Sequence, residues 1–296
     1  MTKQKTKILV PDENLEWKNS VNWANLSIDE RRDLLEKEEK FDIDLFDNPP
    51  TYQLQPEEID YEQKKLTTRI KLKIANWASH IGINHFIRRG DFSIEEIKGV
   101  ENLKNIKTGA IITCNHFSPN DTFVMQKVLK KCKKKNSFRI IREGNYTNPP
   151  VLKFFMRNCG VLPLSSNMKT MKKFLRAVDN ILQRGDNIVI YPEEGMWLDY
   201  RKPRPLKDGA FRFASKNNVP VVPIFITMKY GEKLTQKGNK SPIYTVHILP
   251  AIEPNTQLSL KENIEIMKQL NYDAWCNVYE QVYGEKVEYL KKPTEN

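Results

Sequence analysis

From about residue 92 onward, short apolar runs alternate with stretches of helical periodicity, and this alternation limits the possible folds more than any other feature. Continuous apolar runs between helices are typical of parallel strands that are buried on both faces. The sequence therefore predicts an α/β fold with a largely parallel sheet of about seven strands, flanked by helices on both faces and preceded by an N-terminal helical extension. The expected strands are residues 92–97, 110–114, 138–141, 161–164, 188–191, 221–227 and 244–249; the expected helices are 122–131, 149–158, 168–184 and 209–217, with further core helices in 258–290.

Three parts follow from this pattern. Residues 1–65 form an acidic N-terminal extension, in which S-I-D-E at 27–30 predicts a capping box that opens a helix. Residues 66–91 form an amphipathic helix, and residues 92–296 form the α/β domain. The four cysteines lack the paired spacing of a zinc site or a disulfide framework, so we expect reduced thiols, no metal and no bound cofactor.

Functional side chains of a parallel sheet are expected in the loops beyond the carboxyl ends of its strands. His116, Arg142 and Glu193 each follow an expected strand within two residues. We therefore expect these three residues to lie at the same edge of the sheet.

N-H-F-S-P-N-D at residues 115–121 places a histidine and a carboxylate on a turn between a strand and a helix. Asp121 is expected to fold back toward the ring of His116. A carboxylate bonded to Nδ1–H fixes the tautomer and stabilises the imidazolium, so that Nε2 can act as a general base. An isolated pair of this spacing also fits a loop histidine beside a helix N-cap. Cys114 shares a face with His116 if the strand continues, which adds a Cys–His nucleophilic pair as an alternative.

Further blocks surround this motif in a fixed order. They are V-E-N-L at 100–103, R-E at 142–143, Y-P-E-E-G at 191–195 and V-P-V-V-P-I at 219–224. Together the blocks resemble those of the glycerophospholipid acyltransferase family, the lysophosphatidic acid acyltransferase-like proteins, whose first motif is N-H-x4-D. The resemblance implies that residues 92–296 form an acyltransferase-like domain.

In that family the histidine deprotonates the hydroxyl of a lysophospholipid or related polar lipid, which attacks the thioester of acyl-coenzyme A or acyl-carrier protein. The resemblance thus implies His116 as the base, Asp121 as its orienting acid, and the acyl donor as a co-substrate. Backbone amides near the motif are candidates to stabilise the oxyanion. The resemblance and the charges nearby imply that substrate is bound by Asn115, Arg142, Glu143, Glu193, Gly195, Arg201 and Arg204.

Two segments depart from the family's pattern. G-V-L-P-L-S-S at 160–166 has serines where the family has an acidic residue and an arginine that holds the acceptor's phosphate. E-G-M-W at 194–197 replaces the family's G-T-R. Arg201 and Arg204 follow a few residues later, where they either supply phosphate-binding charge or belong to a solvated basic loop.

The net charge of +11 is unevenly distributed: residues 1–65 carry −6 and residues 66–296 carry +17. A positive catalytic part suits anionic lipid head groups, coenzyme A phosphates or an acidic carrier protein. The densest basic run, at 130–135, has no aromatic side chains for base stacking, and nucleic acid is not an expected partner.

An apolar stripe with basic neighbours runs through residues 64–89. Such a helix either lies on an anionic membrane surface or packs on the domain core. Because the sequence has no run of eighteen apolar residues and no N-terminal h-region, we expect a cytoplasmic protein, peripherally associated with the inner face of the cell membrane. The stripe consists of Leu66, Ile70, Ile74, Trp77, Ala78 and Ile81.

The function expected from the sequence is transfer of a fatty acyl group to a lipid hydroxyl. Two alternatives stay open. One is an esterase or thioesterase that uses the same dyad, and the other is a noncatalytic lipid-binding module that uses the basic surface.

Overall fold

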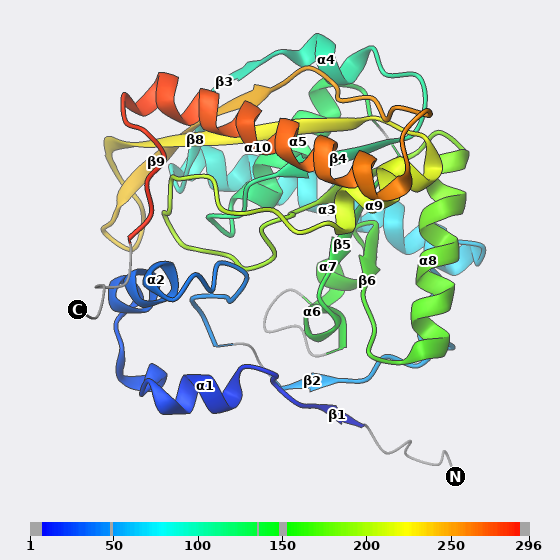
Figure 1. Ribbon diagram of the computed structural model, residues 1–296, viewed down its shortest axis with the longest axis horizontal. Helices are drawn as coiled ribbons and strands as arrows, with labels where there is room; N and C mark the ends of the chain where they lie inside the picture. Colours follow the sequence, from blue (N-terminus) through cyan, green and yellow to red (C-terminus); the bar gives the residue numbers. More distant parts are fainter. Residues whose placement is uncertain (1–7, 48–49, 135, 148–152, 291–296) are drawn as a thin grey trace.

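The computed structural model describes residues 8–47, 50–134, 136–147 and 153–290. Its main element is a seven-stranded sheet with the strand order β3-β9-β8-β4-β7-β5-β6 (Figure 1). All seven expected strands are confirmed, with shifted ends in most of them. The strands are β3 (Ser93–Lys98), β4 (Ala110–Cys114), β5 (Ser137–Ile141), β6 (Val161–Pro163), β7 (Asn187–Ile190), β8 (Val221–Leu234) and β9 (Lys240–Ile248).

The direction of the strands confirms a largely parallel sheet. β8, β4, β7, β5 and β6 all run the same way. β9 returns antiparallel to β8, and β3 pairs parallel with β9, so these two strands run in the opposite direction. The carboxyl ends of β4, β7 and β5 therefore lie next to one another at one edge.

Helices cover both faces of the sheet, as expected. On β4, Ile111 packs into one hydrophobic cluster with α8 (Met168–Gln183), α9 (Gly209–Asn217) and α10 (Leu260–Tyr283). The adjacent Ile112 points to the other face. It packs into a second cluster with α3 (Leu66–Arg89), α4 (Val100–Lys104) and α5 (Asp121–Lys131). Burial on both faces explains why β4 is apolar at nearly every position.

Two short helices lie between β5 and β6. α6 (Glu143–Thr147) was not predicted from the sequence. The helix expected at 149–158 is confirmed in α7 (Lys153–Asn158), and its residues 149–152 lie outside the described residues.

The N-terminal extension is helical and packs on the domain (Figure 1). The expected capping box is confirmed, because Ser27 and Glu30 exchange side-chain and backbone hydrogen bonds at the start of α2. Phe41, Ile43 and Leu45 form a third hydrophobic cluster with Trp197 and other buried residues. The extension therefore contacts the loop that follows β7. Its elements are β1 (Leu9–Val10), α1 (Leu15–Ser20), η1 (Trp23–Asn25), α2 (Ile28–Lys37) and β2 (Thr51–Tyr52).

Candidate active site

His116 and Asp121 form a hydrogen-bonded pair directly beyond the carboxyl end of β4. The ring Nδ1 lies 2.7 Å from Asp121 Oδ2, which confirms the expected fold-back of the helix-initiating aspartate. The Asp121 side chain is fully buried, whereas the His116 side chain is 22% exposed. Within the described residues, the second carboxylate oxygen, Oδ1, is buried without a hydrogen-bond partner. The pair thus combines a buried anion with an imidazole that solvent can reach.

Tyr191, directly after β7, forms one wall for the histidine ring. The two ring centroids lie 4.4 Å apart at an interplanar angle of 30°. Burial raises the pKa of Tyr191 well above its usual value, so this ring stays neutral. The sequence showed Tyr191 at the end of a strand and gave no sign of this contact. Tyr191 and Asp121 together fix the imidazole with Nδ1 engaged, and Nε2 is the nitrogen suited to exchange a proton with a substrate.

Glu193 and Arg204 form a buried ion pair beneath the histidine. Their side chains are 2% and 1% exposed, and Arg204 Nη2 lies 2.8 Å from Glu193 Oε2. Glu193 also accepts a hydrogen bond from the backbone N–H of His116 at 2.9 Å, and Arg204 donates to the His116 carbonyl at 3.0 Å. The pair therefore holds the main chain of His116 on both sides. This differs from the expected substrate-binding roles, because both side chains are buried and engaged by protein groups.

Replacing Arg204 with methionine is expected to lower the free energy of unfolding by about 3 kcal/mol, because it leaves the Glu193 carboxylate buried without its counter-ion. Urea unfolding of the purified protein would measure the loss. Arg212→Met removes an exposed arginine from α9 and serves as the matched control, with an expected change below about 0.5 kcal/mol. Equal free energies of unfolding for the two variants would contradict a stabilising role of the Glu193–Arg204 ion pair.

Two further expected site residues stabilise the loops of the domain. The buried Asn115 side chain accepts a hydrogen bond from the Ile226 N–H at 2.8 Å and donates to the Ile226 carbonyl at 3.0 Å. It thereby fixes the turn after β4 to β8. The buried Glu143 carboxylate accepts hydrogen bonds from the Leu54 N–H at 2.7 Å and the Ser166 N–H at 2.9 Å. Asn115 and Glu143 therefore contact protein groups where substrate contacts were expected.

The remaining expected site residues have separate partners. Arg142 forms an ion pair with Asp44 of the extension. Gly195 lies against the extension, since a Cβ at this position would come within 2.6 Å of the Ile43 carbonyl oxygen. Arg201 is exposed, and its guanidinium lies 5.4 Å from the centroid of the Tyr283 ring. Arg142 and Gly195 therefore contact the N-terminal extension, and Arg201 contacts the Tyr283 ring.

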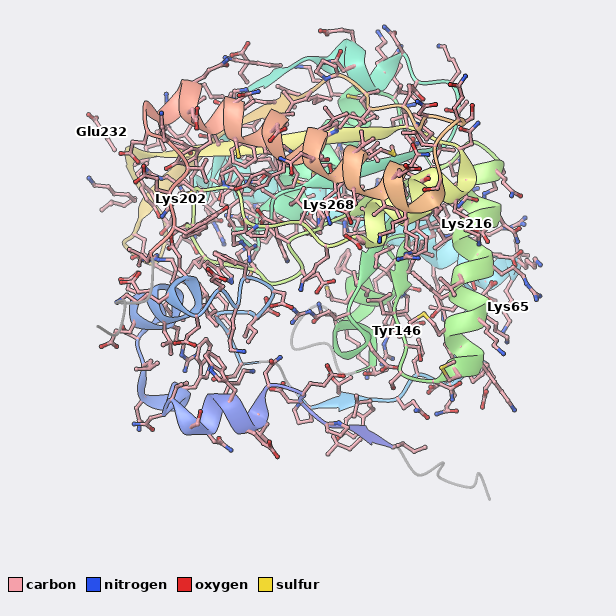
Figure 2. The ribbon with its side chains drawn as sticks, viewed as in Figure 1. Lys65, Tyr146, Lys202, Lys216, Glu232 and Lys268 are labelled. Atoms are coloured by element: carbon pink, nitrogen blue, oxygen red, sulfur yellow. The ribbon has the colours of Figure 1, made fainter. Side chains whose placement is uncertain are left out.

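The basic loop at 201–204 is not a freely solvated segment. Lys202, on the left in Figure 2, donates to the buried Glu36 carboxylate of α2 at 2.7 Å. With Arg204 buried beside Glu193, the loop joins the extension to the sheet edge. The sequence does not indicate that Glu36 is the partner of Lys202, because the two residues are far apart along the chain.

The structure does not support the alternative Cys–His pair. Cys114 is fully buried, and burial raises the pKa of its thiol well above the usual value. A thiol in this environment stays protonated and unreactive. Among the residues that the structure describes, no cluster of three or more His, Cys, Asp or Glu side chains could hold a metal ion.

The apolar stripe of α3 faces solvent. The exposed fractions are 71% for Leu66, 68% for Trp77 and 51% for Ile81, and Ile70 and Ile74 are also exposed. Other α3 side chains, such as Ile83, make the contacts with the core. Across the described parts of the chain, no helix has the length and apolar character needed to cross a bilayer.

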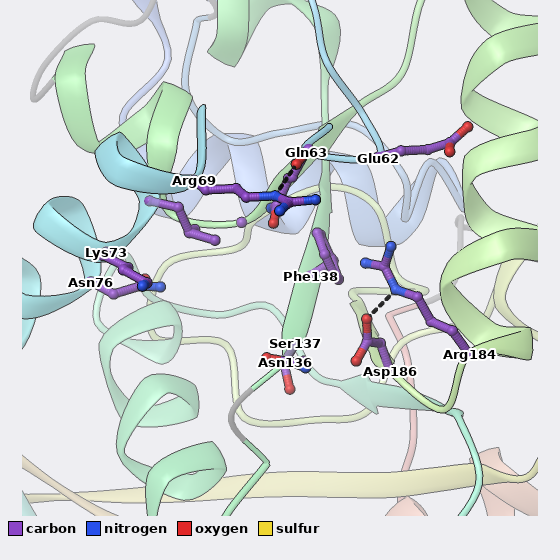
Figure 3. A pocket seen from close by; sticks show the side chains of 12 residues that line it. Glu62, Gln63, Arg69, Lys73, Asn76, Asn136, Ser137, Phe138, Arg184 and Asp186 are labelled. Carbon is purple, nitrogen blue, oxygen red and sulfur yellow. Dashed lines mark hydrogen bonds and ion pairs between the residues drawn. The ribbon is translucent and has the colours of Figure 1, made fainter. Parts of the chain in front are cut away.

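A cavity of about 400 Å³ has a lining that does not include His116 or Asp121. Figure 3 shows the side chains around it. Arg69 and Lys73 of α3 line one side, and the Arg184–Asp186 ion pair lines another. Ser137, at the amino end of β5, also lines it. Since His116 lies beyond the carboxyl end of the neighbouring parallel strands, the cavity and the dyad are at opposite edges of the sheet.

Part of the chain is similar to known acyltransferases. Residues 95–227, which include the whole His116–Asp121 turn, match the family model described as Acyltransferase. A chloroplastic 1-acyl-sn-glycerol-3-phosphate acyltransferase of Brassica napus is 29% identical over 130 residues, covering 44% of this chain and 36% of that protein. A chloroplastic enzyme of the same description from Arabidopsis thaliana is 30% identical over 129 residues, covering 43% and 34%. The chain thus matches about a third of the length of these two relatives.

Among solved structures, the 1-acyl-sn-glycerophosphate acyltransferase of Thermotoga maritima aligns with a TM-score of 0.49 and 18% sequence identity. The alignment covers 73% of this chain and 81% of that chain.

Proposed function

We propose that the chain, whose residues 95–227 match the Acyltransferase family model, is an O-acyltransferase that moves a fatty acyl group to a hydroxyl of a lysophospholipid or related polar lipid. The acyl donor is acyl-coenzyme A or acyl-carrier protein. One observation carries the proposal: a buried carboxylate orients an accessible imidazole at the sheet edge where a substrate can reach it.

The reaction uses His116 as a general base. Nε2 takes the proton of the acceptor hydroxyl while the oxygen attacks the thioester carbonyl, and Asp121 stabilises the imidazolium that forms. Collapse of the tetrahedral intermediate breaks the carbon–sulfur bond and releases the thiol, with the proton returned by the imidazolium. A thiolate is a good leaving group because thiols have pKa values of about 8.5, so one base is sufficient.

The buried pair below the histidine supports this step. Glu193 and Arg204 bind both the N–H and the carbonyl of His116, so the imidazole is held on a fixed backbone. Tyr191 restricts the rotation of the ring. A catalytic base held in this way loses little entropy when the substrate binds.

The proposal is tested by incubating the purified protein with acyl-coenzyme A or acyl-carrier protein and a panel of lysolipids and polyols, followed by mass spectrometry of the products. A new acyl ester of one acceptor is the expected result. Release of free fatty acid alone would favour the thioesterase alternative. Lipid binding with no turnover would favour the noncatalytic module.

We further propose that α3 attaches the protein peripherally to an anionic membrane, the inner face of the cell membrane for a cytoplasmic enzyme. Exposed apolar side chains such as Ile70 and Trp77 would enter the interface, while Arg69 and Lys73 meet anionic head groups. Lys130 of α5 lies beside His80 of α3 and adds positive charge there. This position would bring the enzyme to its lipid substrates.

Trp77→Ser is expected to reduce partitioning onto vesicles that contain anionic lipid by about tenfold or more, because burial of a large apolar side chain contributes about 1.5–3 kcal/mol. Sedimentation with the vesicles would measure the bound fraction. Leu234→Ser, at a similarly exposed apolar position in the β8–β9 hairpin, is the control and should bind like the wild type. The same loss in both variants would contradict a specific role for α3.

A further inference from the structure

Asp44 fills an anion-binding position next to the candidate active site. Its carboxylate pairs with the guanidinium of Arg142 and accepts a hydrogen bond from the backbone N–H of Met196. Arg142 also donates to the Asp42 carbonyl at 3.3 Å. A guanidinium combined with a backbone N–H is the arrangement that binds a phosphate or carboxylate group. In this chain the anion in that arrangement is an internal carboxylate.

This position is connected to the catalytic histidine by a short path. Met196 precedes Trp197, whose backbone N–H donates to the His116 carbonyl at 3.1 Å. The Trp197 indole N–H donates to the Ile43 carbonyl at 2.7 Å, next to Asp44 in the chain. The head group of a lysolipid lies only a few bonds from the hydroxyl that is acylated. Its charge must therefore be accommodated close to this loop.

Two other cations near the loop are also paired with carboxylates of the chain. Arg204 is paired with Glu193 at 2.8 Å, and Lys207 with Asp42 at 2.8 Å. Glu194 adds a further carboxylate to the loop. Together with Arg142 and Asp44, three cations around this loop are thus paired with carboxylates of the chain, and an incoming phosphate would have to displace one of them.

The serine segment does not replace the missing charge. Ser165 is buried, and its hydroxyl donates to the Glu143 carboxylate at 2.8 Å. The backbone N–H of Ser166 donates to the same carboxylate. This segment is therefore engaged by an acidic side chain of the protein.

We propose that Asp44 determines the acceptor: by occupying Arg142, it directs the enzyme toward hydroxyl-bearing lipids whose head group lacks a phosphomonoester. The inference rests on the proposed function and narrows its acceptor class. An uncharged or amine-bearing head group can bind beside the loop without displacing Asp44. A phosphomonoester must compete for Arg142 with the Asp44 carboxylate, which is part of the same chain.

The test compares kcat/KM for two acceptors of the same acyl chain, 1-oleoylglycerol and 1-oleoylglycerol 3-phosphate, with oleoyl-coenzyme A as donor and the full chain as enzyme. Wild type should prefer 1-oleoylglycerol. Asp44→Asn should shift the ratio toward the phosphate by at least about tenfold, because the amide no longer neutralises Arg142. Asp179→Asn removes a carboxylate that pairs with Lys216, between α8 and α9 and outside this loop, and should leave the ratio within about twofold.

A double variant distinguishes a change in acceptor selectivity from a folding defect caused by Asp44→Asn. Adding Arg142→Gln to Asp44→Asn should abolish the gain, because the released guanidinium is the group that would bind the phosphate. A wild type that prefers the phosphate acceptor would overturn the inference while leaving the acyltransferase function in place. Equal shifts in the Asp44 and Asp179 variants would overturn it too. Absence of transfer to every acceptor in the panel would instead remove the proposed function, and the inference with it.

Discussion

Replacing His116 with alanine is expected to lower kcat/KM for acyl transfer by at least about 10³-fold, because the acceptor hydroxyl loses its general base. The side chain is accessible, and its Nδ1 is already engaged by Asp121, which leaves Nε2 to take the proton. Transfer of radiolabelled acyl groups from acyl-coenzyme A to the best acceptor measures the loss. His80→Ala removes a histidine of α3 beside Lys130 and should retain wild-type rates.

A second substitution at the same position excludes a folding defect. Alanine leaves the buried Asp121 without its ring partner, which can lower stability. Glutamine can still donate a hydrogen bond to the carboxylate, yet it cannot take a proton from the acceptor. Both variants should therefore be inactive, with His116→Gln keeping a melting temperature close to that of the wild type. Activity within tenfold of the wild type in His116→Gln would contradict the role of the base.

Asp121→Asn is expected to lower kcat by about 10²–10⁴-fold while leaving the fold intact. The amide is close in shape to the carboxylate, but it carries no charge to stabilise an imidazolium. Its NH₂ group can also turn toward Nδ1 and favour the tautomer that has the proton on Nε2. That tautomer cannot act as the base.

Asp208→Asn provides the matched control for Asp121→Asn. Asp208 also lies at the start of a helix, α9, and pairs with Lys268 at 2.8 Å. Its loss should change kcat by less than about twofold, because a partly exposed ion pair outside the candidate site contributes little. If both variants have similar kcat values, Asp121 acts only as a helix-initiating residue.

The strands could be predicted from the sequence because burial on both faces leaves a continuous apolar run. β4 was predicted with its observed ends, residues 110–114. β8 was expected to end at residue 227, yet it continues to Leu234, where exposed residues approach the start of β9. An apolar run indicates that a strand is buried, but it does not indicate whether the strand runs parallel or antiparallel to its neighbour. The antiparallel return of β9 therefore could not be read from the sequence.

The dyad could be predicted because its two members lie five residues apart on one turn. The partners of Arg204 and Arg142 in the extension could not be predicted from the sequence. Arg204 donates to the carbonyl of Phe41, 163 positions earlier, and Arg142 pairs with Asp44, 98 positions earlier. Sequence patterns identified these arginines as charges near the site. The packing of the extension determines that Arg142 is paired with Asp44 and that Arg204 donates to the Phe41 carbonyl.

The most direct test of general-base catalysis is to follow a radiolabelled acyl group from acyl-coenzyme A in the presence of a lysolipid or monoacylglycerol acceptor. Wild-type protein should place the label in a new ester of the acceptor, and His116→Gln should give only the background of a reaction without enzyme. Label recovered chiefly as free fatty acid, or equal amounts of labelled ester from both proteins, would contradict deprotonation of the acceptor by His116.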